Sequence, residues 1–210
     1  YELYAGSPAA WTAVASGSKS YDLLGRLTST AWSDSLGSPP STLESYAYLY
    51  DIDNRRTRMT LKDASYWDYQ YDSLGNLTQS TNALGHTQRY THDGAGRVLT
   101  HTDANGTLGT YTYDPRGRML SASVGGIASH YTYTPSGQLA SAQFAHGHRI
   151  SYQYDAAQRL VGWSDNRGAS ASYALDPMGN RTSEEIRNAQ GQQVWQLARS
   201  INSLNRVEST

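Results

Sequence analysis

The chain contains six histidines, and histidine is the commonest metal ligand among protein side chains. Two of them, His146 and His148, are separated by one residue, so they would lie on the same face of a β-strand. A zinc site needs a third protein ligand at a recognisable spacing, and the sequence offers none. We therefore expect ordinary surface histidines, with no metal and no cofactor.

Aspartates are also numerous, and carboxylates serve as calcium ligands and as catalytic acids and bases. Here they recur in the pattern Asp-x-x-Gly, without the alternating Asp and Asn residues of a calcium loop. Asp at the first position, Pro at the second and Gly at the fourth are the preferences of a type I β-turn. The segments Asp114–Gly117 and Asp176–Gly179 satisfy all three preferences. The pattern therefore predicts turns rather than ion sites.

Nucleophilic catalysis finds no support in the sequence. There is no cysteine, no Gly-x-Ser-x-Gly elbow and no Gly-Lys-Ser/Thr phosphate loop. We expect no catalytic activity, and the rival hypothesis is an enzyme site within residues 1–20 or 183–210. The formal net charge of -1 does not favour binding to nucleic acid. An apolar run long enough for a membrane span and a signal-peptide pattern are both missing from this segment.

Most of the candidate residues belong to a sequence repeat. The segment Tyr71–Leu77 returns with small changes at His92, Tyr113, Tyr133, Tyr154 and Leu175, in steps of 21, 21, 20, 21 and 21 residues, and an earlier copy begins at Tyr21. Weaker turn signals lie halfway between the copies, at Asn82, Asp103, Asp165 and Asn188. Each repeat therefore predicts two antiparallel strands of about six or seven residues and two turns. The positions that define the repeat are Tyr71, Asp72, Gly75, Tyr113, Asp114, Gly117, Tyr133, Gly137, Tyr154, Asp155, Asp176 and Gly179.

Tyrosine supplies much of the apolar surface, with 17 Tyr and 5 Trp against 1 Phe. Tyrosines two residues apart, such as Tyr111 and Tyr113, place both rings on one face of a strand, so we expect a ladder of rings along one face of the sheet. The arginine that follows many of the turns is expected to lie over a neighbouring tyrosine ring. Residues 183–200 are predicted to form a strand, a turn and a strand.

Two stretches depart from the repeat, which spans residues 21–207. Residues 1–20 show no register and are expected to form an irregular or degenerate edge. Pro39 and Pro40 cannot lie in a central strand, so an insertion loop is expected at about residues 37–45. No separate catalytic domain is expected. Neither end of the chain resembles a repeat cap, so we expect open sheet edges that associate when the segment is expressed alone.

The Tyr-Asp-x-x-Gly-Arg-Leu core, the 21-residue spacing and the Tyr-x-Tyr lead-in resemble the RHS family, also called YD repeats, over residues 21–207. The departures are Asp51–Asn54, which lacks the glycine, Thr134 in place of Asp, and Ala157-Gln158 in place of Leu-Gly. The expected fold class is all-β, an antiparallel β-hairpin meander of 21-residue repeats. The resemblance implies that this meander forms part of a spiralled β-shell.

The resemblance also implies a function. RHS shells of bacterial polymorphic toxins enclose a C-terminal toxin domain and are delivered by type VI secretion or as part of a Tc-type complex. Because a full bacterial shell is several times longer than this chain, we expect one structural segment of a shell wall, secreted or delivered by a specialised secretion system. Its expected partners are the remainder of the shell, the enclosed toxin domain and a secretion-spike protein or chaperone.

Two further points concern the same resemblance. Animal teneurins use a related shell in adhesion, and exposed Tyr and Trp rings can stack on sugars, so a cell-surface adhesion or carbohydrate-binding module is the alternative. RHS toxins often cleave themselves through a pair of aspartates near an Asp-Pro-x-Gly segment. Asp114–Gly117 and Asp176–Gly179 match only those four positions and lie in register as repeat turns, so no protease role is assigned to them.

Overall fold

The computed structural model describes residues 2–5, 12–34, 41–202, 204 and 206–209. The chain divides into two compact units, unit 1 at Tyr1–Thr107 and unit 2 at Leu108–Thr210. Both units consist of antiparallel strands joined by short turns, so the expected all-β hairpin meander is confirmed. Within the described ranges, no helix is both long enough and apolar enough to cross a membrane.

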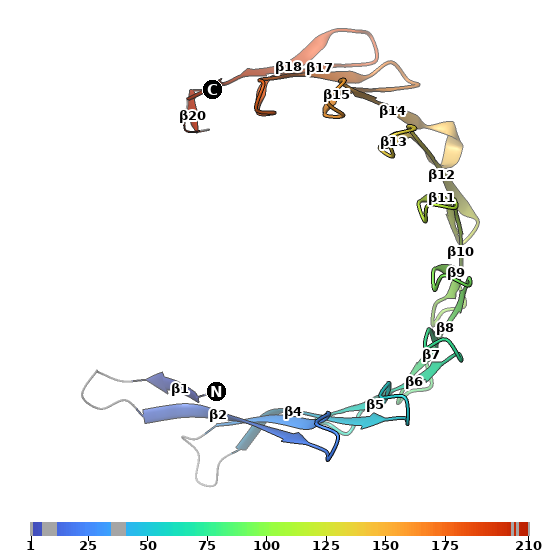
Figure 1. Ribbon diagram of the computed structural model, residues 1–210, viewed down its shortest axis with the longest axis vertical. Helices are drawn as coiled ribbons and strands as arrows, with labels where there is room; N and C mark the ends of the chain where they lie inside the picture. The colour runs from blue at the N-terminus through green and yellow to red at the C-terminus, as the bar shows by residue number, and fades with distance from the viewer. Residues whose placement is uncertain (1, 6–11, 35–40, 203, 205, 210) are drawn as a thin grey trace. The chain divides into compact units, whose positions relative to one another are not determined.

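In the described part of unit 1, nine strands follow one another in chain order, and each pairs with its sequence neighbours (Figure 1). They are β1 (Glu2–Ala5), β2 (Thr12–Tyr21), β3 (Leu27–Asp34), β4 (Ser41–Tyr50), β5 (Arg56–Leu61), β6 (Tyr66–Tyr71), β7 (Leu77–Asn82), β8 (Thr87–His92) and β9 (Val98–Thr102). Most of them have five or six residues, close to the length that the turn spacing predicts.

Unit 2 repeats this arrangement with β10 (Leu108–Tyr113), β11 (Met119–Val124), β12 (Ile127–Tyr133), β13 (Leu139–Gln143), β14 (Arg149–Tyr154), β15 (Leu160–Asp165), β16 (Ser170–Leu175), β17 (Arg181–Arg187) and β18 (Gln193–Ala198). A short 3-10 helix, η1 (Ala145–Gly147), lies between β13 and β14. Strands β19 (Ser200–Ile201) and β20 (Val207–Ser209) form a separate two-stranded sheet. The strand, turn and strand predicted for residues 183–200 are confirmed by β17 and β18.

Two kinds of turn alternate along each unit. The YD turns follow the Tyr-Asp core and occupy residues 22–26, 51–55, 72–76, 93–97, 114–118, 134–138, 155–159 and 176–180. The mid-repeat turns lie between them and occupy residues 61–65, 82–86, 103–107, 144–148, 165–169 and 188–192, and a two-residue turn at Gly125 and Gly126 takes this place between β11 and β12. In a meander, alternate turns fall on opposite edges of the sheet, so the YD turns of each unit share one edge.

Most turns of both kinds reverse the chain in the same way, the exceptions being the turn that contains η1 and the two-residue turn between β11 and β12. In turn 114–118 the Gly117 N–H donates to the Asp114 carbonyl, and the Asp114 N–H donates to the Arg118 carbonyl, both at 2.9 Å. Gly117 has a φ of 81°, a left-handed conformation that glycine adopts without strain. The register then shifts by one residue at Tyr113. A type I turn followed by a left-handed residue and a bulge is a common hairpin connection, so the predicted turn type is confirmed.

The two faces of the sheet carry different side chains. One face carries the tyrosines, and small residues stand opposite some of them, as in the register pairs Tyr111 with Ala122 and Tyr131 with Ala142. On the other face, hydroxyl groups pair across neighbouring strands at 2.6–2.7 Å, namely Thr91 with Thr100, Thr112 with Ser121, and Thr132 with Ser141. We call these the ring face and the hydroxyl face.

Few side chains are buried, because a single sheet has no second layer to cover it. Among the residues whose burial is described, the buried apolar ones are Ala15, Ala142 and Ala171, and the buried polar ones are Ser80 and Asp114. The tyrosines of the YD cores are mostly half-buried against their neighbours in the sheet. Hydrogen bonds and ring contacts within the sheet therefore contribute more to this fold than a hydrophobic core does.

Residues 1–20 were expected to form an irregular or degenerate edge, and their described part consists of strands. Strands β1 and β2 occupy part of residues 1–20, and β2 has 10 residues that pair with both β1 and β3. Pairing with β3 gives this segment its extended form although its sequence lacks apolar alternation. The loop expected at about residues 37–45 overlaps β4, which begins at Ser41, and residues 35–40 lie outside the described residues.

Candidate functional site

The aspartate of each YD turn is the hydrogen-bond acceptor that organises the turn. Asp114 Oδ1 accepts bonds from the backbone N–H groups of Arg116 and Arg118, both at 2.9 Å. Its Oδ2 accepts a bond of 2.7 Å from Nε of Arg118 and lies 2.6 Å from Nη2 of the same side chain. The carboxylate therefore caps the turn and pairs with an arginine at the same time.

The same pair recurs along both units. Nitrogen–oxygen distances of 2.6–2.7 Å join Asp22 with Arg26, Asp51 with Arg55, Asp93 with Arg97, and Asp155 with Arg159. In two turns an asparagine replaces the arginine, and Asn76 and Asn180 donate to Asp72 and Asp176 at 2.9 and 2.7 Å. The side chain of the fifth residue of these YD turns thus bonds to the aspartate of its own turn, whether that side chain is a charged arginine or a neutral asparagine.

Hydrogen bonds lower the pKa of the YD aspartates. At Asp22, Asp93 and Asp155 the largest cause is the bond from the backbone N–H of the arginine four residues later, and burial partly opposes it. At Asp72 the largest cause is the side-chain amide of Asn76. These carboxyl groups are therefore ionised at neutral pH, as their role as acceptors requires.

The arginines also connect one YD turn to the next. Nη1 of Arg26 donates to the carbonyl of Asp51 at 3.0 Å, and Nη1 of Arg55 donates to the carbonyl of Asp72 at 3.1 Å. In unit 2 the equivalent bond from Arg159 reaches Asp176 at 2.9 Å. Each of these side chains binds its own aspartate and the backbone of the following turn.

The same arginines stack on the tyrosines of the next repeat, as the sequence predicts. The guanidinium carbon lies 5.0 Å from the ring centre of Tyr50 for Arg26 and 4.5 Å from that of Tyr133 for Arg118. Arg55 has the same contact with Tyr71, at 5.3 Å. Contacts of this kind contribute about 0.5–1 kcal/mol each at exposed sites.

The tyrosine hydroxyl also connects neighbouring repeats, but it bonds to the repeat before its own, whereas the arginine bonds to the repeat after its own. It donates to a backbone carbonyl of the previous repeat, from Tyr50 to Leu27 at 2.7 Å, Tyr71 to Arg56 at 2.8 Å, Tyr133 to Met119 at 2.8 Å, and Tyr154 to Leu139 at 2.9 Å. Turns 22–26, 51–55 and 72–76 are thus joined in sequence by both an arginine arm and a tyrosine arm, whereas the links within unit 2 have one arm or the other. We call the turns so joined in each unit the YD row.

The irregular copies keep the turn by other means. Asn54 and Gln158 take the place of the glycine, each with a φ of 65°. At Thr134 the side-chain oxygen replaces the aspartate and accepts the N–H of Gln138 at 3.1 Å. Gln138 replaces the arginine and donates to Gln158 Oε1 at 3.0 Å in the next YD turn. The departures from the consensus therefore preserve both the reversal and the link.

The repeat positions singled out in the sequence occupy the YD row. Asp72, Asp114, Asp155 and Asp176 cap YD turns; Gly75, Gly117, Gly137 and Gly179 are their left-handed residues; and Tyr71, Tyr113, Tyr133 and Tyr154 end the strands before them. The tyrosine hydroxyl bonds and the arginine bonds to the next turn were not predicted from the sequence. Their only sequence signal is the fixed spacing of Arg and Tyr between successive copies.

The histidines considered as metal ligands lie at a mid-repeat turn of unit 2. His146 has a φ of 61° inside η1, and Nε2 of His148 lies 3.1 Å from Asp165 Oδ2. The two side chains therefore do not form a pair on one strand face. No group of three or more metal-binding side chains occurs in the part of the chain that the structure describes.

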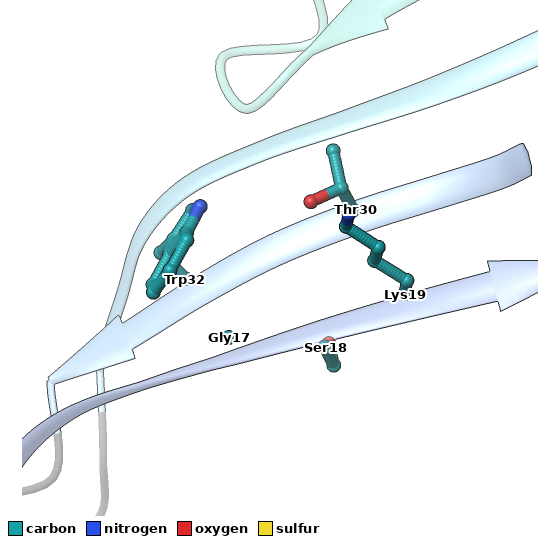
Figure 2. Close-up of a pocket in the computed structure, with 5 residues that line it drawn as sticks. All are labelled: Gly17, Ser18, Lys19, Thr30 and Trp32. Atoms are coloured by element: carbon teal, nitrogen blue, oxygen red, sulfur yellow. The ribbon is translucent and has the colours of Figure 1, made fainter. Parts of the chain in front are cut away.

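A small cavity lies between β2 and β3 in unit 1 (Figure 2). Its volume is about 230 Å³, and it is lined by Gly17, Ser18, Lys19, Thr30 and Trp32. Gly17 stands opposite Trp32, and a Cβ built on this glycine would lie 2.9 Å from the indole ring. Only a glycine lets the ring lie this close to the neighbouring strand.

Comparisons with known proteins place this geometry in a family. Residues 12–205 match the family described as Teneurin YD-shell. A crystal structure of TcdB2-TccC3 superposes with a TM-score of 0.72 at 15% identity, over 90% of this chain and 12% of that chain. The Photorhabdus luminescens Tc holotoxin pore gives a TM-score of 0.72 at 13% identity, over 98% of this chain and 14% of that chain.

The structural matches at these identities show a shared fold, and this chain spans about an eighth of the length of the matched chains. No match was found among the curated proteins. The family match covers nearly all of the repeats and confirms the resemblance to RHS/YD repeats. The chain belongs to the teneurin YD-shell family, and it is a structural segment of a YD shell.

Proposed function

We propose that this segment forms part of the wall of a closed shell that encloses a toxin domain and is exported with it by a specialised secretion system. The observation that carries the proposal is the YD row, which joins successive turns within a family of shell-forming repeats. Its partners would be the rest of the shell, the enclosed toxin domain and a secretion-spike protein or chaperone. The role is mechanical and involves no catalysis.

The sheet has the physical properties that a thin wall needs. It is one layer thick and has two chemically different faces. Hydrogen bonds within that layer hold it together. A domain that folded around its own core would need a second layer over the ring face. A wall needs none, because the space that it encloses and the surrounding solvent lie against its two faces.

Protection from proteolysis tests this proposal in the complete gene product. We expect its C-terminal domain to resist a protease that digests the same domain expressed alone. The double variant Arg55→Asn, Tyr71→Phe removes both arms of one link and should accelerate digestion of that domain. Arg167→Asn, which changes an exposed mid-repeat tip, should leave the digestion rate unchanged. Equal digestion of the free domain and the domain within the gene product would contradict enclosure.

The cavity beside Trp32 supports a second candidate, a carbohydrate-binding or adhesive module. An indole next to Thr30 could stack on a sugar ring and offer a hydroxyl partner. A glycan array with the purified chain distinguishes the two functions. Saturable binding that is lost in Trp32→Ala but retained in Trp163→Ala would favour the second candidate. Absence of binding across the array would eliminate it.

A further inference from the structure

One link of unit 1 differs from the others. Between turns 72–76 and 93–97, Asn76 stands where Arg55 stands one repeat earlier, and His92 stands where Tyr71 stands. The amide of Asn76 donates to Asp72 Oδ2 at 2.9 Å, within its own turn. The arginine arm and the tyrosine arm are therefore replaced together at the same link.

His92 does not restore the missing bond. Among the described residues, Nδ1 of His92 is buried and has no hydrogen-bond partner. Tyr71, at the matching position one repeat earlier, donates its hydroxyl proton to the Arg56 carbonyl at 2.8 Å. An imidazole is shorter than a phenol, and a buried polar atom without a partner costs free energy. Compared with the link at Tyr71, this link lacks the hydroxyl bond and has a buried nitrogen without a hydrogen-bond partner.

The strands on either side provide little compensation. Strands β7 and β8 pair between Gln79–Arg89 and Thr81–Thr87, and the hydroxyls of Thr81 and Thr87 lie 3.0 Å apart. Within the described residues, neither a charge pair nor a ring stack joins these two strands.

The β5–β6 junction has a ladder of the same length, from Arg58–Asp68 to Thr60–Tyr66. It is also crossed by two charge-assisted bonds between Arg58 and Asp68, at 2.5 and 2.7 Å. Arg58 in addition lies 4.2 Å from the ring centre of Tyr66. The two junctions thus share their backbone pairing and differ in their side-chain contacts.

We infer that the β7–β8 junction is a built-in seam, the place at which the sheet of unit 1 opens first. Local opening in proteins follows the local density of stabilising contacts, and this junction has fewer of them than the equally long β5–β6 junction. Opening at the seam separates β1–β7 from β8–β9 without breaking an arginine arm of turns 22–26 or 51–55. The inference rests on contacts within unit 1 and holds whether or not the chain encloses a toxin.

Native-state hydrogen exchange of the backbone amides tests the seam. The amides that bridge β7 and β8 should exchange at least about tenfold faster than those that bridge β5 and β6, the factor expected from one or two lost hydrogen bonds. The double variant Asn76→Arg, His92→Tyr builds both missing arms and should slow exchange at β7–β8 by a similar factor. The reciprocal variant Arg55→Asn, Tyr71→His should accelerate exchange at β5–β6.

Leu84→Arg is the matched control, because it adds an arginine at the exposed tip of turn 82–86, on the opposite edge of the sheet from the YD turns. It should leave both junctions unchanged. Equal exchange at the two junctions of the wild-type protein would overturn the inference. So would unchanged β7–β8 exchange in a folded Asn76→Arg, His92→Tyr protein. If that variant does not fold, the reciprocal variant decides, and unchanged β5–β6 exchange in it overturns the seam.

Discussion

The YD turns and the mid-repeat turns reverse the chain with similar hydrogen bonds. They differ in the contacts that their side chains make with neighbouring turns. In turn 103–107, Asp103 accepts the N–H groups of Asn105 and Thr107 at 2.9 and 2.8 Å, much as Asp114 accepts those of its own turn. The difference is the fifth residue, which is Thr107 in one turn and Arg118 in the other. In these two turns the cap alone reverses the chain, whereas Arg118 in addition stacks on Tyr133 of the next repeat.

The contacts that stabilise the two edges of the sheet therefore extend over different lengths of the chain. Several mid-repeat turns are capped by carboxylates or amides within their own hairpins, as at Asn82 and Asn188. Turn 165–169 is the exception, because Asn166 also donates to the Gly147 carbonyl of the previous mid-repeat turn at 2.7 Å. YD turns are held by their hairpins and by the turns before and after them. Four experiments separate these two contributions.

Acid should have the largest effect, because it acts on every aspartate cap at once. The YD aspartates have pKa values below their usual range, so their contribution to stability is complete above the unfolded-state value near 3.9. It is lost as the pH falls through the lowered folded-state values. We expect the free energy of unfolding to decrease once the pH is lower than about 4. Near neutral pH these groups should contribute little to any change in it.

Denaturant titrations across this pH range measure the loss, and a pair of double variants assigns it. Replacing Asp22 and Asp93 by Asn should remove more of the acid dependence than replacing Asp63 and Asp103. The reason is that each aspartate in the first set pairs with an arginine in its own turn. Equal effects of the two sets would show that the arginines add nothing to the caps.

Removing one cap from each edge gives the next largest difference. Asp114→Ala leaves two backbone N–H groups and the Arg118 guanidinium without their acceptor, whereas Asp103→Ala affects a turn without an arginine. We expect Tm to fall further for Asp114→Ala, by roughly 5 °C or more relative to Asp103→Ala. Thermal unfolding followed by circular dichroism measures both. Similar falls in Tm would mean that the two edges are equivalent.

The tyrosine arm can be removed without changing the ring. Tyr71→Phe deletes the bond to the Arg56 carbonyl and should lower the free energy of unfolding by about 0.5–1.5 kcal/mol. Tyr69→Phe, two residues earlier on the same face of β6, is the matched control and should have little effect. Urea denaturation of both variants is the measurement. A loss of equal size in Tyr69→Phe would show that tyrosine hydroxyls contribute through hydration instead.

The smallest effect concerns backbone strain in a mid-repeat turn. Ala64 has a φ of 65°, a conformation that costs an alanine more than a glycine. Ala64→Gly should raise the free energy of unfolding by about 0.5–1 kcal/mol, the relieved strain less the added freedom of the unfolded chain. Ala95 lies in a YD turn and does not have a positive φ, so Ala95→Gly should slightly lower the free energy of unfolding. Destabilisation by Ala64→Gly would contradict the strain argument.

The sequence alone predicts much of this structure, because each repeat carries its turn signals locally. The spacing from Tyr71 to Leu175 predicts the strands, and Asp-Pro-x-Gly predicts the turn type at residues 114–117. The stacking of Arg118 on Tyr133 was also predictable from the repeat. These features depend on residues within one repeat or at a fixed distance in the next.

The features that were missed depend on register between strands. The bond from Tyr154 to the Leu139 carbonyl forms because a one-residue bulge beside the turn brings the ring to that carbonyl, and a pattern of residue types does not reveal the bulge. Strand β2 was missed because its pairing with β3, including Gly17 opposite Trp32, replaces apolar alternation as the cause of its extended form. Pairing partners become visible only once the strands are placed side by side.

The arms of the YD row reach from one repeat to the next and no further. Stability is then a sum of contributions from single repeats and from the contacts between neighbours, as in other repeat proteins. A gene that gains or loses one 21-residue repeat changes one such contact and leaves the others intact. Proteins of this design can therefore change in length during evolution by duplication or deletion of single repeats, without simultaneous substitutions elsewhere in the sheet.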